Sequence, residues 1–236
     1  KMTSLTNLLS GQLRMTYKNL LSLIKFKNGG NMLNSDITKR FSDCAWFKPM
    51  DITVVGLGGV GRGVAETLFI QGHRLTVWDH DVVEAVNAFQ GYQSKFIGWK
   101  KTDAFKFQMA EFVGDTSELN CYGKKWEAFN GLNKIVIAAA DDWNTLEDMY
   151  NRWKINDGDL FISPGMLADM FSIQVYMKDD GRDWLGGSDT ESVPCTTKSS
   201  MYMAKSIHGR VVSIVNKFII DPSLVDANYR FNGLLD

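Results

Sequence analysis

A cluster of four glycines is the first feature of the sequence whose residue types and spacing can do chemistry. Residues 52–68 read ITVVGLGGVGRGVAETL, in which an apolar run passes into the cluster and then into a pattern typical of a helix. Backbone N–H groups at such a turn, together with the positive end of the following helix, can bind an anion. Tight packing of a helix on a strand is the alternative explanation. The glycines concerned are Gly56, Gly58, Gly59 and Gly61.

An acidic residue follows at the distance that a nucleotide site requires. Asp79 stands twenty-three residues after Gly56, at the end of a predicted strand over residues 73–79. A carboxylate in this place can accept hydrogen bonds from the hydroxyl groups of a ribose. The glycines and Asp79 together predict a nucleotide, but NAD, FAD, a methyl donor and ATP all use this arrangement.

The elements that must position these groups alternate along the chain. Apolar runs predict strands at residues 50–56, 73–79 and 132–139, and helical spacing predicts helices at 60–71, at 101–113 and after Asp142 through Trp153. This order predicts a parallel sheet with helices on both faces and with ligands at the carboxyl ends of the strands. We therefore expect an α/β fold with a Rossmann-like, mostly parallel sheet.

The two ends of the chain have a different character. Towards the C-terminus the sequence predicts strands at 159–164, 171–177 and 229–235, of antiparallel type, and a helix at 201–218. Residues 178–198 are polar and glycine-rich, and a loop of this length is usually functional. Apolar spacing over residues 3–27 predicts a helix docked on the core, on a second subunit or on a membrane surface. We expect an N-terminal helical extension, residues 1–49, and a nucleotide-binding domain, residues 50–236.

Composition limits the class of protein. Lys and Arg number 26 against 27 Asp and Glu, so no global attraction to nucleic acid or anionic lipid is expected. We expect no signal peptide, and the sequence contains no run of apolar residues long enough to span a membrane. Cys44, Cys121 and Cys195 are too far apart for a CxxC zinc site or a disulfide framework. These features predict a cytoplasmic protein that binds neither nucleic acid nor a membrane.

Two further segments resemble a known family. Residues 75–101 read LTVWDHDVVEAVNAFQGYQSKFIGWKK, and residues 138–153 read AAADDWNTLEDMYNRW. The chain thus combines a GxGGxG turn, a DxDxVxxxN segment, a lysine after it and an aspartate after a later strand. In this combination it resembles the ThiF/MoeB family, the adenylating core shared with ubiquitin-activating enzymes, over residues 52–153.

The resemblance implies ATP-dependent adenylation of a carboxylate. The ionised carboxylate attacks the α-phosphorus of ATP and pyrophosphate leaves, so the enzyme positions the reactants and neutralises charge without a strong base. The resemblance makes Asp79 the ribose ligand, Lys101 a contact of the triphosphate and Asp142 the ligand of Mg²⁺. Capping of the following helix is the alternative role for Asp142, or for Asp141 beside it. The remaining nucleotide-binding positions are Asp81, Asn87 and Gln90.

The chain departs from the family at the triphosphate site. Where the family has an arginine and then a glutamine after its asparagine, this sequence has Gln90 and Gly91. Loss of one such donor can cost roughly 3–4 kcal/mol of transition-state stabilisation. Arg62, in the first turn of the helix after the glycines, or Lys100 can supply the missing charge. Arg40 is either the arginine that relatives supply across a dimer interface or a solvated loop residue.

Cys195 is the candidate nucleophile. It precedes a predicted helix, whose N-terminal N–H groups and dipole favour a thiolate. Its position resembles that of the cysteine on which ubiquitin-activating relatives form a thioester, and a buried or capping-adjacent cysteine is the alternative. The histidines form no catalytic triad pattern: we interpret His80 as a turn residue and His208 as a residue on the face of the late helix.

The resemblance also indicates partners. It implies that the substrate carboxylate is the C-terminus of a ubiquitin-like or sulfur-carrier protein or peptide, and that the chain forms a homodimer. Two alternatives stay open. A NAD-dependent oxidoreductase on the same fold would use Asp79 without requiring Lys101 or Asp142, and a catalytically reduced ThiF-like binding protein is consistent with the missing arginine.

Overall fold

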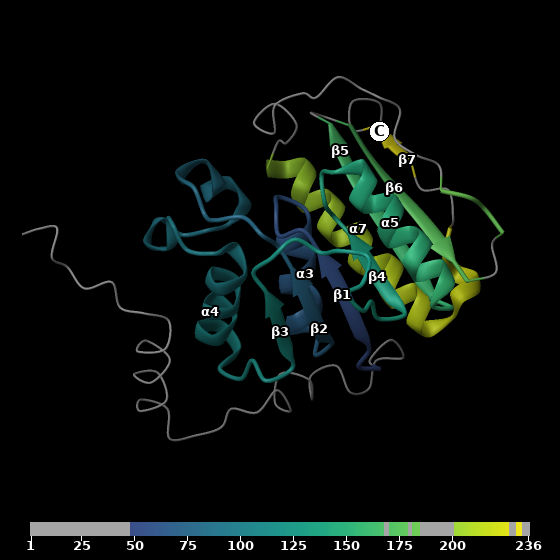
Figure 1. Cartoon of the computed structure of the whole chain (residues 1–236), viewed down its shortest axis with the longest axis horizontal. Helices are drawn as coiled ribbons and strands as arrows, with labels where there is room; N and C mark the ends of the chain where they lie inside the picture. The colour runs from purple at the N-terminus through teal and green to yellow at the C-terminus, as the bar shows by residue number, and fades with distance from the viewer. Residues whose placement is uncertain (1–47, 168–169, 179–180, 185–200, 227–229, 233–236) are drawn as a thin grey trace, which may run out of the picture. The chain divides into compact units, whose positions relative to one another are not determined.

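A single mixed sheet organises the described part of the chain (Figure 1). The computed structural model describes residues 48–167, 170–178, 181–184, 201–226 and 230–232. Among these residues seven strands pair in the order β3-β2-β1-β4-β5-β6-β7. The strands are β1 (Asp51–Val55), β2 (Arg74–Trp78), β3 (Leu119–Tyr122), β4 (Ile135–Ala138), β5 (Leu160–Leu167), β6 (Met170–Met177) and β7 (Arg230–Asn232).

The sheet is parallel from β3 to β5 and antiparallel beyond it. β1 pairs in parallel with both β2 and β4, whereas β6 pairs antiparallel with β5 and with β7. At its carboxyl end, Val55 of β1 lies between Trp78 of β2 and Ala138 of β4. The segments that follow these three strands therefore leave the sheet at the same edge, which is where ligands gather in folds of this class.

Helices cover both faces of the sheet. The α-helices are α3 (Gly61–Ile70), α4 (Lys101–Val113), α5 (Trp143–Ile155) and α7 (Met201–Ile220), and the 3₁₀ helices are η1 (Ala85–Gln90), η2 (Ser94–Phe96) and η3 (Pro222–Leu224). Side chains of α3, α4 and α7 share one buried cluster with the sheet, and side chains of α5 share a second cluster on the opposite face.

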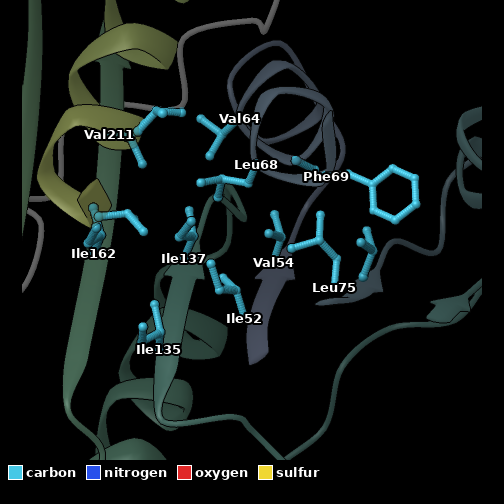
Figure 2. Close-up of a cluster of buried hydrophobic side chains, with 14 of the residues drawn as sticks. Ile52, Val54, Val64, Leu68, Phe69, Leu75, Ile135, Ile137, Ile162 and Val211 are labelled. Atoms are coloured by element: carbon cyan, nitrogen blue, oxygen red, sulfur yellow. The ribbon is translucent and has the colours of Figure 1, made fainter. Parts of the chain in front are cut away.

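The first cluster follows directly from the alternation of side chains along the strands. Ile52 and Val54 of β1 point to the same face, where they meet Val64 and Leu68, one turn apart on α3 (Figure 2). Val211 brings α7 onto this face (Figure 2). Burial of these fully enclosed aliphatic side chains, each about 1.5–3 kcal/mol, holds the helix that begins at the glycine turn firmly against β1.

The structure confirms the fold that the sequence predicts. Strands and helices of the alternating half lie within a few residues of their expected positions, and residues 101–113 form α4 with the expected bounds. The predicted antiparallel strands are β5 and β6, with β5 running on to Leu167, and the predicted last strand is described as β7 over Arg230–Asn232 only. Cys121 lies on β3.

Other expectations fall outside the described residues. Residues 1–47 belong to this group, so the division into an extension of residues 1–49 and a domain of residues 50–236 stays a prediction. Most of the loop expected at 178–198 also lies outside. Within the described part of the chain, no helix is long and apolar enough to cross a membrane.

Candidate functional site

The glycine turn joins β1 to α3 at the carboxyl edge of the sheet. Gly56 has a φ of 93°, and a Cβ atom there would lie 2.4 Å from the carbonyl oxygen of Ala139. A Cβ on Gly61 would lie 1.9 Å from the carbonyl oxygen of Gly56. Packing therefore requires glycine at these two positions. Gly58 is different, because a Cβ there would meet nothing within 4 Å.

The turn leaves a row of amide donors without protein partners. In the part of the chain that the structure describes, the N–H groups of Gly58, Gly59, Val60 and Gly61 donate to no protein acceptor. The first bond of the helical type runs from the Arg62 N–H to the Gly58 oxygen, at 3.2 Å. The first turn of α3 contains no acidic side chain that would occupy these donors. Successive free amides at the positive end of a helix form an anion-binding site.

Asp79 ties this turn to the end of β2. Its carboxylate is buried and accepts hydrogen bonds from the Leu57 N–H at 2.6 Å and from the Asp81 N–H at 2.8 Å. The first bond crosses from β2 to the glycine turn and holds the two segments together. A carboxylate has about four lone-pair sites, so Asp79 retains acceptor capacity for a ribose hydroxyl.

Lys101 and Asp81 form an ion pair just after Asp79 in the chain. Lys101 begins α4, and its Nζ donates to Asp81 Oδ2 at 2.7 Å with only 8% of the lysine side chain exposed. Burial opposes ionisation of Asp81, but the hydrogen bond and charge of Lys101, aided by His80 and Lys100, lower the pKa of the Asp81 carboxyl. A phosphate oxygen could replace Asp81 as the partner of the Lys101 ammonium group.

Asn87 and Gln90 lie on η1, between β2 and α4. The Asn87 Oδ1 accepts from the Glu84 N–H at 2.8 Å, so this buried amide caps the 3₁₀ helix. The Oε1 atom of Gln90 is buried and has no hydrogen-bond partner among the described residues. A carbonyl oxygen cannot replace a guanidinium, so Gln90 does not restore the charge that the family pattern places here.

Arg62 is buried and already neutralised. Its Nη1 pairs with Glu66 at 2.9 Å, its Nη2 donates to Gln108 at 3.3 Å, and its guanidinium carbon lies 5.1 Å from the ring centre of Tyr92. Only Nε lacks a partner among the described residues. The positive charge of Arg62 is therefore compensated in this structure. Supplying it to a phosphate would require the guanidinium to leave Glu66.

Asp142 caps α5. Its Oδ1 accepts from the Asn144 N–H at 3.2 Å, and its Oδ2 accepts from the Thr145 hydroxyl at 2.5 Å and the Lys125 ammonium at 3.0 Å. The hydrogen bond from Thr145, followed by that from Lys125, lowers the pKa of the Asp142 carboxyl. Of the two neighbouring acids, Asp142 is thus the cap. Its side chain is 40% exposed and remains ionised, as a metal ligand must be.

His208 joins the glycine turn from a distant part of the sequence. It lies on α7 and is buried, and its Nε2 lies 2.8 Å from the carbonyl oxygen of Gly59. Burial lowers the pKa of His208, although the hydrogen bond to Gly59 opposes this. His208 thus lies on a face of its helix, as interpreted from the sequence, and this face is the buried one that contacts the glycine turn. Its spacing from Ala204, Ile207 and Val211, all buried, was the signal that this histidine points inward.

Known proteins share this arrangement of elements. Neither a protein-family model nor a curated protein sequence matches the chain. The crystal structure of PaaA matches with a TM-score of 0.64 and 16% identity, covering 97% of this chain and 81% of PaaA. MccB from E. coli, solved with AMPCPP and MccA, matches with a TM-score of 0.64 and 14% identity, covering 86% of this chain and 67% of MccB.

A third structure extends the comparison. The E. coli tRNA N6-threonylcarbamoyladenosine dehydratase, TcdA, matches with a TM-score of 0.61 and 17% identity, covering 80% of this chain and 94% of TcdA. The chain has the fold of the E1/ThiF-like adenylating enzymes. In other MccB structures the chain spans 58–61% of the length of MccB. At these identities the likeness establishes the ThiF-like fold.

Of the cysteines and the upstream arginine considered in the sequence, the structure describes only Cys121. Cys195 and Arg40 lie outside the described residues, so their predicted roles stay predictions. Cys121 lies on β3, where burial raises the pKa of its thiol to about 12. A thiol with so high a pKa is a poor nucleophile.

Proposed function

We propose that this protein adenylates a carboxylate with ATP. The observation that carries the proposal is the row of free amides from Gly58 to Gly61, anchored through Asp79 to the end of β2, where the buried Lys101 pairs with Asp81. A triphosphate needs several donors and a positive charge, and this edge of the sheet supplies both. MccB, which shares the fold, has been solved with ATP.

The reaction would form one bond to phosphorus and break another. A carboxylate oxygen attacks the α-phosphorus, the bond from that phosphorus to the bridging oxygen of pyrophosphate breaks, and an acyl adenylate and pyrophosphate result. The free amides and the Lys101 ammonium stabilise the charge on the phosphate oxygens, and Asp79 accepts from the ribose. Asp81, Asn87 and Gln90 would surround the same nucleotide.

The residues present fit a magnesium ion at Asp142. Mg²⁺ prefers one or two carboxylates together with phosphate oxygens and water, and it would neutralise the charge of the triphosphate. The Asp142 carboxylate is ionised and partly exposed, and its contact with Lys125 is a surface ion pair worth at most about 1 kcal/mol. Replacement of the Lys125 contact by a metal ion would therefore cost little free energy.

The substrate in this proposal is the C-terminal tail of a ubiquitin-like or sulfur-carrier protein or of a peptide. MccB has been solved with MccA, which supports a peptide or protein substrate for the shared fold. A homodimer, and transfer of the acyl group to Cys195 as a thioester, belong to the same proposal.

A second candidate function is a nucleotide-binding protein with reduced turnover. The neutralised guanidinium of Arg62 and the uncharged Gln90 favour it, because the site then has one positive charge fewer than the family pattern. Pyrophosphate exchange separates the two functions. ATP with Mg²⁺ should bind in titration calorimetry whereas NAD should not, and labelled pyrophosphate should enter ATP only when a suitable C-terminal peptide is present. Tight NAD binding without ATP binding would overturn both.

Asp142→Asn tests the metal role separately from the capping role. Asparagine caps helices as well as aspartate does, so the free energy of unfolding should change by less than about 1 kcal/mol. Loss of the carboxylate should weaken ATP binding in the presence of Mg²⁺ by about tenfold or more. Asp141→Asn, at the neighbouring acid that does not cap the helix, is the matched control and should leave both quantities unchanged. Equal ATP affinity in the two variants would remove Asp142 from the metal site.

A further inference from the structure

His208 of α7 contacts the carbonyl oxygen of Gly59, in the turn that forms the proposed phosphate site. A carbonyl oxygen only accepts, so the 2.8 Å contact to Gly59 requires that His208 Nε2 carries the proton and donates it. Both groups are separated by 149 positions in the sequence, so the bond is purely tertiary.

The bond determines where the next amide points. The described residues contain no cis peptide bond, and in a trans peptide the C=O and N–H groups point in opposite directions from one rigid plane. Since His208 holds the Gly59 oxygen towards α7, the Val60 N–H on the same peptide plane is directed away from α7. Val60 is one of the residues whose amide has no acceptor among the described residues.

The histidine ring occupies the space that the missing side chain of Gly63 leaves on α3. A Cβ atom on Gly63 would lie 1.9 Å from Cε1 and 2.1 Å from Nδ1 of His208, so the ring stands directly over this glycine. The buried residues Ile207 and Val211 fix α7 on either side of the histidine against the same cluster that contains Val64. The ring therefore has little freedom to leave the Gly59 oxygen.

We propose that His208 is a positioning residue that orients the Gly59–Val60 peptide for phosphate binding. Without the bond, this peptide turns about ψ of Gly59 and φ of Val60, and the first of these torsions is only weakly restricted because residue 59 is a glycine. The inference rests on the proposed function for the identity of the anion, a nucleotide phosphate. The orientation of the peptide itself does not depend on that identity.

Three variants separate the hydrogen bond from the bulk of the ring. His208→Gln retains an N–H donor, His208→Leu removes it, and Gly63→Ala keeps the histidine but displaces it from the turn. We expect His208→Leu and Gly63→Ala each to weaken ATP binding by about tenfold, the scale of one hydrogen bond, and His208→Gln to weaken it much less. In a His208→Ala background, Gly63→Ala should have no further effect, because the ring that it displaces is absent.

A measurement without nucleotide tests the positioning directly. The ¹⁵N order parameter of the Val60 amide should be about 0.85 in the parent protein and in His208→Gln, and below about 0.6 in His208→Leu and Gly63→Ala. Equal order parameters in His208→Leu and the parent would overturn the inference, whatever the affinity for ATP. If the order parameters behave as expected and the parent binds no ATP, the positioning role stands and the proposed function fails. Urea unfolding of each variant shows which of them are folded. If His208→Leu is unfolded, the Val60 order parameters of Gly63→Ala and His208→Gln are compared instead.

Discussion

A buried histidine should make the stability of this protein fall steeply in mild acid. His73 precedes β2 and is 2% exposed, and its Nδ1 accepts a hydrogen bond from the Met50 N–H at 3.2 Å. Burial, aided by the charge of Arg74, lowers the pKa of His73 from 6.5 to about 4. A proton added at Nδ1 would break the bond to Met50 and leave a charge in the core. The folded protein therefore resists this proton until the pH approaches 4.

The magnitude follows from the difference between the folded and unfolded pKa values. Between pH 6.5 and 4 the unfolded chain binds a proton that the folded chain does not, so the free energy of unfolding rises with pH across this range. At about 1.36 kcal/mol per pKa unit the whole contribution is about 3 kcal/mol. It is fully present above pH 6.5, and about 2 kcal/mol of it should be lost between pH 7 and pH 5.

Urea unfolding of the parent and of His73→Gln at a series of pH values measures this loss. Glutamine offers an oxygen to the Met50 N–H and does not titrate. Burial also lowers the pKa of His208, which contributes with the same sign, but both proteins contain His208 and its effect cancels in the difference. If the difference between parent and variant changes by less than about 0.5 kcal/mol between pH 7 and pH 5, His73 is not the source of the acid sensitivity.

Two substitutions test the contacts that shape the candidate site. Asp79→Asn leaves one acceptor and places an NH₂ group against a backbone N–H. The free energy of unfolding, measured in urea, should therefore fall by about 2–4 kcal/mol. The control Asp51→Asn, at an exposed carboxylate, should lower it by less than about 1 kcal/mol. Equal effects would show that the buried bonds of Asp79 contribute little. Gly91→Ala forces a side chain into a φ of 91° and within 2.4 Å of Arg62, and should cost about 1–3 kcal/mol. Gly98→Ala has a φ of 86° and an open surrounding, so a larger loss at Gly91 measures the crowding of Arg62.

The order of strands and helices was predictable because their signals are local. The apolar run of β1, the glycines after it and the periodic spacing of α3 lie within twenty residues of one another. The strand-end position of Asp79 needed only the next strand in the chain. The capping role of Asp142 was equally local, since its partners Asn144 and Thr145 follow directly.

The contacts that the sequence did not reveal join distant segments. The position of the Arg62 guanidinium depends partly on a hydrogen bond to Gln108, forty-six positions away, which packing of α3 against α4 brings near. Without knowledge of that packing, the sequence suggests that an arginine after a glycine turn is available to bind a phosphate. The role of His208 is a stronger case, because the residue lies 149 positions beyond the carbonyl that it contacts.

Periodicity and residue types at short spacing were enough to predict the ThiF-like fold and the edge of the sheet at which a nucleotide would bind. The folded structure was needed to learn which partners the charged side chains and backbone groups at that edge have. It shows Lys101 paired with Asp81, Arg62 hydrogen-bonded to Gln108 of α4, and Gly59 held by His208. The physical reason is that ion pairs and hydrogen bonds act over a few ångströms in space, and the folded sheet and helices set those distances.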